Sequence, residues 1–151
     1  MTDAASVNSR TRILIVDDNR SGLIARKSVL QEMGHEVAIS QTARGALDLF
    51  QAEPFDIVIT DFRMPNSNGL ELIRDLRAVR PEVPIILISG FTDALGLDEE
   101  TTGADAVIQK SHTEVQQLVR AVSRLLRKAQ KKPARSQAAS VSTRKRGAGN
   151  V

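Results

Sequence analysis

Polar side chains that can bind cations or phosphate follow four of the short apolar runs in this chain. Asp17 and Asp18 come after the first run, Asp61 closes the third, Ser89 the fourth, and Lys110 the fifth. In an open parallel sheet, ligands bind beyond the carboxyl ends of the strands. If the runs are strands of such a sheet, we expect these five side chains to meet at one edge.

Three carboxylates at one edge would repel one another unless a cation joins them. Hard oxygen ligands of this kind suit Mg²⁺, which is often held by a few carboxylates together with phosphate oxygens. With Lys110 beside them, the three carboxylates predict a site that accepts a phosphoryl group. Asp61 is then the expected nucleophile, forming an aspartyl phosphate, while Ser89 and Lys110 bind phosphoryl oxygens.

The elements that must position these residues alternate regularly between strand and helix. Each apolar run is too short for a buried helix and rich in β-branched residues, which favours strands covered on both faces. The run at residues 35–40 is less apolar than the others, which is typical of an edge strand. The alternation predicts an α/β fold, a parallel sheet with helices on both faces. The expected strands are residues 13–16, 35–40, 57–59, 85–88 and 107–108.

Helical periodicity fills the intervals between the strands. Thr42 is the expected cap of one helix, Thr113 with Gln116 forms a capping box for another, and Gly34 ends the first. We expect a weaker helix at residues 93–102 and a loop at 62–69. The apolar stripes are Leu23, Leu30 and Met33; Ala43, Ala46, Leu47 and Phe50; Leu72, Ile73, Leu76 and Val79; and Val115, Leu118, Val119, Val122 and Leu126.

Composition and charge narrow the classes of function. The 151 residues include no cysteine, which excludes disulfides and thiolate metal sites, and no apolar stretch is long enough to span a membrane. The formal charge is +3, but residues 131–151 hold six basic residues and no acidic ones, so the rest carries −3. This distribution, with 3% aromatic residues, argues against a DNA-binding domain. We expect a cytoplasmic protein.

Several motifs occur together in a fixed order, and with them residues 11–130 resemble a stand-alone, chemotaxis-regulator-like receiver domain of a bacterial two-component response regulator. The resemblance implies a flavodoxin-like (βα)₅ fold with strand order 2-1-3-4-5. It divides the chain into a flexible N-terminus at 1–10, the receiver domain at 11–130 and a basic disordered tail at 131–151. The matching segments are 13–19, 56–61, Met64-Pro65, 69–72, 88–90 and Gly103-Ala104-Asp105 leading to Lys110.

The resemblance also implies roles for individual residues. Asp17, Asp18, Asp61 and the backbone carbonyl of Arg63 would bind Mg²⁺. Asp61 would take its phosphoryl group from a phosphohistidine on a sensor histidine kinase or a phosphotransfer protein, and Ser89 and Lys110 match the family's switch hydroxyl and phosphate-binding lysine. Such a module is not an enzyme in the usual sense, although it promotes its own phosphorylation and dephosphorylation.

Two positions depart from the family's pattern. Val107 stands where the family usually has an aromatic residue, whose reorientation follows the switch hydroxyl. Ser111 stands where the family usually has proline, often after a cis bond. A cis bond before serine would cost about 2.5–4 kcal/mol, so we expect a trans bond and a relocated loop. These departures predict intact phosphorylation chemistry with a non-standard route to the output surface.

Alternatives from other classes remain open at this point. A phosphorylation-independent scaffold or dimerisation module would keep the acidic site for Mg²⁺ or for stability, and a homodimer is left open. The basic tail could attract nucleic acid through electrostatics, although a solubilising end is the simpler interpretation. A signalling module would act on a downstream protein. The basic residues Arg120, Arg124, Arg127 and Lys128 are interpreted as a solvated helix face, in the region where receivers usually meet partners.

Overall fold

A five-stranded parallel sheet lies at the centre of the computed structural model, which describes residues 10–64, 67–90 and 96–130. Its strand order is β2-β1-β3-β6-β7, which confirms the predicted order 2-1-3-4-5 for the five expected strands. The less apolar β2 is an edge strand, as its sequence predicts. The strands are β1 (Arg12–Val16), β2 (Glu36–Ser40), β3 (Ile57–Asp61), β6 (Ile85–Ser89) and β7 (Ala106–Gln109).

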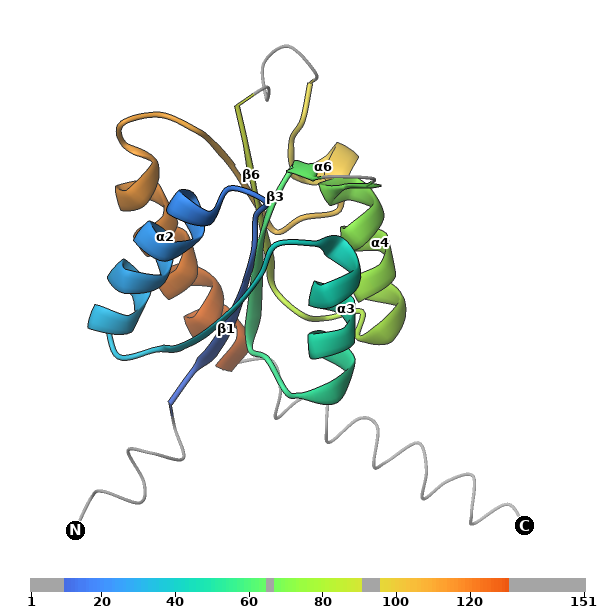
Figure 1. Cartoon of the computed structure of the whole chain (residues 1–151), viewed down its shortest axis with the longest axis horizontal. Coiled ribbons are helices and arrows are strands. Elements are labelled where there is room, and N and C mark those ends of the chain that lie inside the picture. Colours follow the sequence, from blue (N-terminus) through green and yellow to red (C-terminus); the bar gives the residue numbers. More distant parts are fainter. Residues whose placement is uncertain (1–9, 65–66, 91–95, 131–151) are drawn as a thin grey trace, which may run out of the picture.

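Helices cover both faces of this sheet (Figure 1). On one face lie α2 (Arg20–Glu32) and the helix of residues 114–130, here called the C-terminal helix. On the other lie α3 (Ala43–Ala52) and α4 (Gly69–Val79). Within the described residues no helix has the length and apolar character that crossing a bilayer requires.

The apolar runs supply both cores because successive strand side chains point to opposite faces. Ile13 and Ile15 of β1 pack toward α2 and the C-terminal helix, whereas Leu14 and Val16 pack toward α3 and α4. The other strands follow the same alternation. Leu23 and Leu30 of α2 are completely buried in the first core.

Cap residues set the starts of the helices where the sequence predicts them. Thr42 caps α3, its hydroxyl accepting from the N–H of Gly45 at 3.0 Å. Gly34, with φ +97°, follows the end of α2. The capping box of Thr113 with Gln116 stays a prediction. The Thr113 hydroxyl accepts a hydrogen bond from the side-chain amide of Gln117 at 2.9 Å.

Two other local predictions are also corrected. The loop expected at 62–69 contains an antiparallel pair, β4 (Arg63–Met64) and β5 (Ser67–Asn68), and α4 begins at Gly69. Of the helix expected at 93–102, residues 93–95 lie outside the described residues. In the remainder only α6 (Glu99–Thr102) is helical, because Asp98 caps it and Gly96 turns the chain at φ +65°.

Some residues assigned to the apolar stripes are not in the core. Met33, Val79 and Val115 are 41%, 43% and 41% exposed. Each lies in the first or last turn of its helix or at its cap. The predicted N-terminal and C-terminal segments lie outside the described residues, except for Arg10, so the domain boundaries stay a prediction.

Candidate functional site

The strand ends that carry the five predicted side chains lie at one edge of the sheet, because the strand register aligns them. Val16 lies opposite Thr60, and Asp61 opposite Ile88, so Asp17 and Asp61 follow neighbouring strands to the same edge. Ser89 lies opposite Gln109, and Lys110 is the next residue. The sequence-predicted residues therefore follow one another along this edge.

The three acidic residues come together as predicted. Asp17, Asp18 and Asp61 each offer one carboxylate oxygen, and these oxygens lie within 4.8 Å of one another. Asp17 and Asp61 are 1% and 5% exposed, whereas Asp18 is exposed to solvent. Two buried carboxylates with an exposed third form an acidic cup that opens to water on one side.

Asn19 leaves the two aspartates before it free to face this cup. Its side chain caps α2 by accepting from the N–H of Gly22 at 3.0 Å. The backbone N–H of Asn19 donates to Oδ1 of Asp17 at 2.9 Å, which fixes that carboxylate. Asp and Asn residues are both common helix caps, and in this segment Asn19 is the residue that caps α2.

Lys110 points into the cup and contacts the central carboxylate. Its Nζ lies 3.0 Å from Oδ1 of Asp61, and its backbone N–H donates to the carbonyl of Ser89 at 2.9 Å. The second bond continues the pairing of β6 with β7 beyond the last strand residue. Ser89 itself is 1% exposed at the end of β6.

The environment of Asp61 disfavours its charged form. Burial, followed by the charge of Asp17, raises the pKa of Asp61, and Lys110 and Arg26 only partly offset this effect. A divalent cation would relieve this repulsion, and carboxylate oxygens are the donors that Mg²⁺ prefers. The donor set and its burial therefore fit a magnesium ion.

Arg26 of α2 belongs to this site, although sequence reasoning missed it. Its Nη1 lies 2.5 Å from Oδ2 of Asp17, and its Nε donates to Oε2 of Glu114 at 2.7 Å. Burial lowers the pKa of the Arg26 guanidinium, but the bonds to Asp17 and Glu114 outweigh burial, and the net pKa is raised. The formal charges of the site are −4 from the three aspartates and Glu114 and +2 from Lys110 and Arg26. The site therefore has a net formal charge of −2 before any metal binds.

The two positions that depart from the predicted family pattern lie beside this edge. Val107 is half-buried in β7 and packs against the core cluster on the α3 and α4 side. The peptide bond between Lys110 and Ser111 is trans, as predicted, and the Ser111 hydroxyl accepts from the backbone N–H of Thr113 at 3.2 Å. Arg63 lies two residues beyond Asp61 in β4, exposed.

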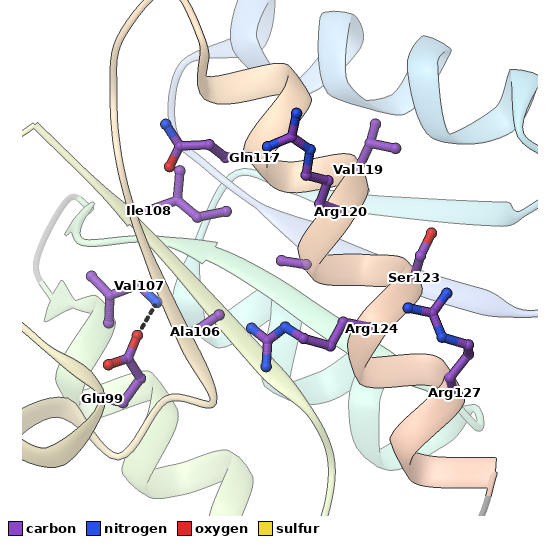
Figure 2. Close-up of a pocket in the computed structure, with 11 residues that line it drawn as sticks. Glu99, Ala106, Val107, Ile108, Gln117, Val119, Arg120, Ser123, Arg124 and Arg127 are labelled. Carbon is purple, nitrogen blue, oxygen red and sulfur yellow. Dashed lines mark hydrogen bonds between the residues drawn. The ribbon is translucent and has the colours of Figure 1, made fainter.

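A separate open groove lies between β7, α6 and the C-terminal helix (Figure 2). Arg120, Arg124 and Arg127 line its helix side, and Val107 lies on its strand side. Across the groove, Glu99 accepts from the backbone N–H of Val107 at 3.2 Å. The three arginines are exposed, as the predicted solvated helix face requires, and they also line this groove.

Comparison with known proteins gives one consistent family. Residues 13–123 match the family model of the response regulator receiver domain. The response regulator MprA of Mycolicibacterium vanbaalenii is 35% identical over 95 residues, covering 63% of this chain and 40% of that protein. The chain spans less than half the length of the curated relatives it matches.

Solved structures agree in fold. A CheY-like receiver domain protein from Methanospirillum hungatei is 30% identical with a TM-score of 0.74, covering 82% of this chain and 99% of that one. The response regulator TrrA from Thermotoga maritima, solved in complex with Mg²⁺ and BeF, is 31% identical. Its TM-score is 0.69, and the match covers 76% of this chain and 98% of that one.

Proposed function

Because this chain belongs to the response regulator receiver domains of two-component systems, we propose that it is a phosphoacceptor module whose Asp61 takes a phosphoryl group. The donor is a phosphohistidine of a sensor histidine kinase or a phosphotransfer protein. The observation that carries this proposal is the buried Asp61 carboxylate, 3.0 Å from Lys110 and within reach of Asp17 and Asp18.

Asp17, Asp18 and Asp61, with the backbone carbonyl of Arg63, would hold Mg²⁺. The bound cation would neutralise the acidic cup and the charge that develops on the phosphoryl oxygens. A carboxylate oxygen of Asp61 attacks phosphorus and forms a P–O bond while the P–N bond to histidine breaks. The imidazole nitrogen keeps the electron pair and takes a proton from solvent.

Lys110 and Ser89 act on the transferred group. The Lys110 ammonium pairs with a phosphoryl oxygen in place of its present contact with Asp61, and the Ser89 hydroxyl donates to a second oxygen. Phosphorylation then shifts a pre-existing equilibrium between two arrangements of the surface. Because Val107 lacks an aromatic ring, we expect this shift to reach the surface by another route than ring reorientation.

The module acts through protein contacts rather than through chemistry on a small substrate. We place the contact with a downstream protein at the groove of Figure 2, which presents Arg120, Arg124 and Arg127 beside the apolar Val107. The comparisons give no support to a scaffold that works without phosphorylation.

The experiment that tests the phosphoacceptor role is intact-mass measurement after incubation with Mg²⁺ and a small acyl phosphate donor. We expect one phosphoryl increment on the wild-type chain and none on Asp61→Asn. Asp56→Asn is the matched control, because Asp56 precedes the other end of β3 and binds the backbone N–H of Arg12 at 2.9 Å. An unlabelled wild type, under conditions that label another receiver, contradicts the proposal.

A further inference from the structure

A buried cation of the protein itself contacts the acidic cup. Arg26 is 6% exposed, and its guanidinium lies 2.5 Å from the Asp17 carboxylate, one of the three that form the proposed cation site. Lys and Arg side chains are almost never fully buried unless they are paired. The placement of Arg26 therefore depends on the acidic residues around it.

The local sequence makes room for this side chain. Gly22 lies one turn before Arg26 on α2, and a Cβ atom there would lie 3.2 Å from Oδ2 of Asp17 and 3.4 Å from Nη1 of Arg26. A side chain at position 22 would crowd the contact between the two groups. The glycine thus leaves the space in which the guanidinium reaches the carboxylate.

Glu114 holds the other side of the guanidinium. Its Oε2 accepts from Nε of Arg26 and lies 2.7 Å from Nη2, and its side chain is 14% exposed. The planar fork of an arginine can bind two carboxylates at once, which an ammonium does less well. Arg26 therefore bridges the acidic cup to the first turn of the C-terminal helix.

A fixed positive charge on a ligand carboxylate opposes the binding of a second cation there. Like charges in a partly buried site interact more strongly than in bulk water. Lys110 contacts Asp61, whereas Arg26 contacts Asp17, so two of the three carboxylates already have a positive partner. We propose that Arg26 is a positioning residue that holds Asp17 and competes with the divalent cation for this carboxylate, so that it weakens cation binding.

This inference rests on the proposed magnesium site, and calorimetric titration of the full chain with Mg²⁺ tests both. Arg26→Met removes the charge and keeps an unbranched side chain, so we expect a Kd lower by about tenfold or more. Arg26→Lys keeps a positive charge, and its Kd should stay within about threefold of the wild-type value. Circular dichroism establishes that each variant is folded.

The Glu114→Gln variant provides a second test, in which Arg26 is kept. The guanidinium would then be neutralised by Asp17 alone, so the competition strengthens and the Kd for Mg²⁺ should rise by about threefold. If Arg26→Met fails to fold, this variant and Arg26→Lys decide the question. A Glu114→Gln Kd equal to or below that of wild type overturns the competition.

The outcomes separate the two proposals. If the wild type and every variant fail to bind Mg²⁺, the cation site itself is wrong. If the wild type binds Mg²⁺ and Arg26→Met binds it equally or more weakly, the site stands and Arg26 is only a structural support for Asp17. Binding by Arg26→Met with none by the wild type would be the extreme form of the expected result.

Discussion

Asp61 is a carboxylate held in a position that costs folding free energy. It is 5% exposed, and burial together with the charge of Asp17 raises its pKa above the usual 3.8. A group with a raised pKa in the folded state binds its proton more tightly there than in the unfolded chain. Its ionisation therefore lowers stability as the pH rises between the two pKa values.

We expect Asp61→Asn to be more stable than wild type at pH 7 without divalent cations, by about 1 kcal/mol. The amide cannot ionise, so the repulsion from Asp17 is removed. The difference should shrink as the pH falls toward 3.8 and vanish well below it, where the wild-type carboxyl is protonated in both the folded and the unfolded state. Urea unfolding across this pH range measures it, with Asp56→Asn as control, and a larger difference at low pH than at pH 7 would contradict the prediction.

At the scale of elements, the step from β3 into α4 fixes the position of Asp61. Phe62 receives a hydrogen bond from the backbone N–H of Gly69 at 2.7 Å and donates its own to Ile88 at 2.9 Å. The β4–β5 pair lies between these two points. The backbone therefore returns to Phe62 at Gly69, the first residue of α4.

Gly69→Ala tests how closely these segments pack. A Cβ atom at position 69 would lie 2.8 Å from the carbonyl oxygen of Asp61 and 2.8 Å from Cδ1 of Leu87. Because the first of these is backbone, the helix start must shift, and we expect a loss of about 2 kcal/mol in the free energy of unfolding.

Gly90→Ala is the matched control, because no atom of the described residues lies within 4 Å of a Cβ atom there. Chemical unfolding of both variants gives the comparison. Equal stability of the two alanine variants would show that the start of α4 tolerates a side chain.

The strands were predictable because their signal is local, whereas parts of the site were not. Ile13 to Val16 and Ile85 to Ile88 are uninterrupted apolar runs, and the polar residues that follow them had to share an edge once the sheet was parallel. Arg26 lies on α2 without any local sign of burial. Its partner Glu114 is 88 positions away, so only the packed fold brings the two together.

The short elements were missed for a related reason. β4 and β5 have two residues each, too few for an alternating pattern. The contacts of Arg77 could not be predicted either. Its guanidinium donates to the carbonyls of Val83 and Gly103 and to the Asp105 carboxylate. These acceptors lie close together only because β6 and β7 begin side by side. Contacts of this kind depend on the tertiary arrangement rather than on neighbouring residues.

At the scale of the whole molecule, both cores are built from residues between Ile13 and Leu125. We propose residues 11–130 as the folding unit. A chain without residues 131–151 should therefore unfold within about 2 °C of the full chain, because it keeps every core residue that the structure describes. Thermal unfolding by circular dichroism measures this, and a drop of 10 °C or more would place stabilising contacts in the removed segment.

The same truncation changes the charge of the molecule. It removes six basic residues, so the formal charge falls from +3 to −3. If the basic segment alone attracts nucleic acid, salt-sensitive retention on heparin or DNA should disappear with it. Retention that persists would assign the interaction to the arginines of the groove in Figure 2.

The bond from Arg26 to Glu114 also has a consequence for how the chain is made. The three aspartates emerge from the ribosome well before residue 114, so a nascent chain reaches a stage at which Arg26 has its partner on one side only. Synthesis of the C-terminal helix supplies the missing carboxylate. The acidic end of the sheet is thus completed only after all five strands of the sheet have been translated.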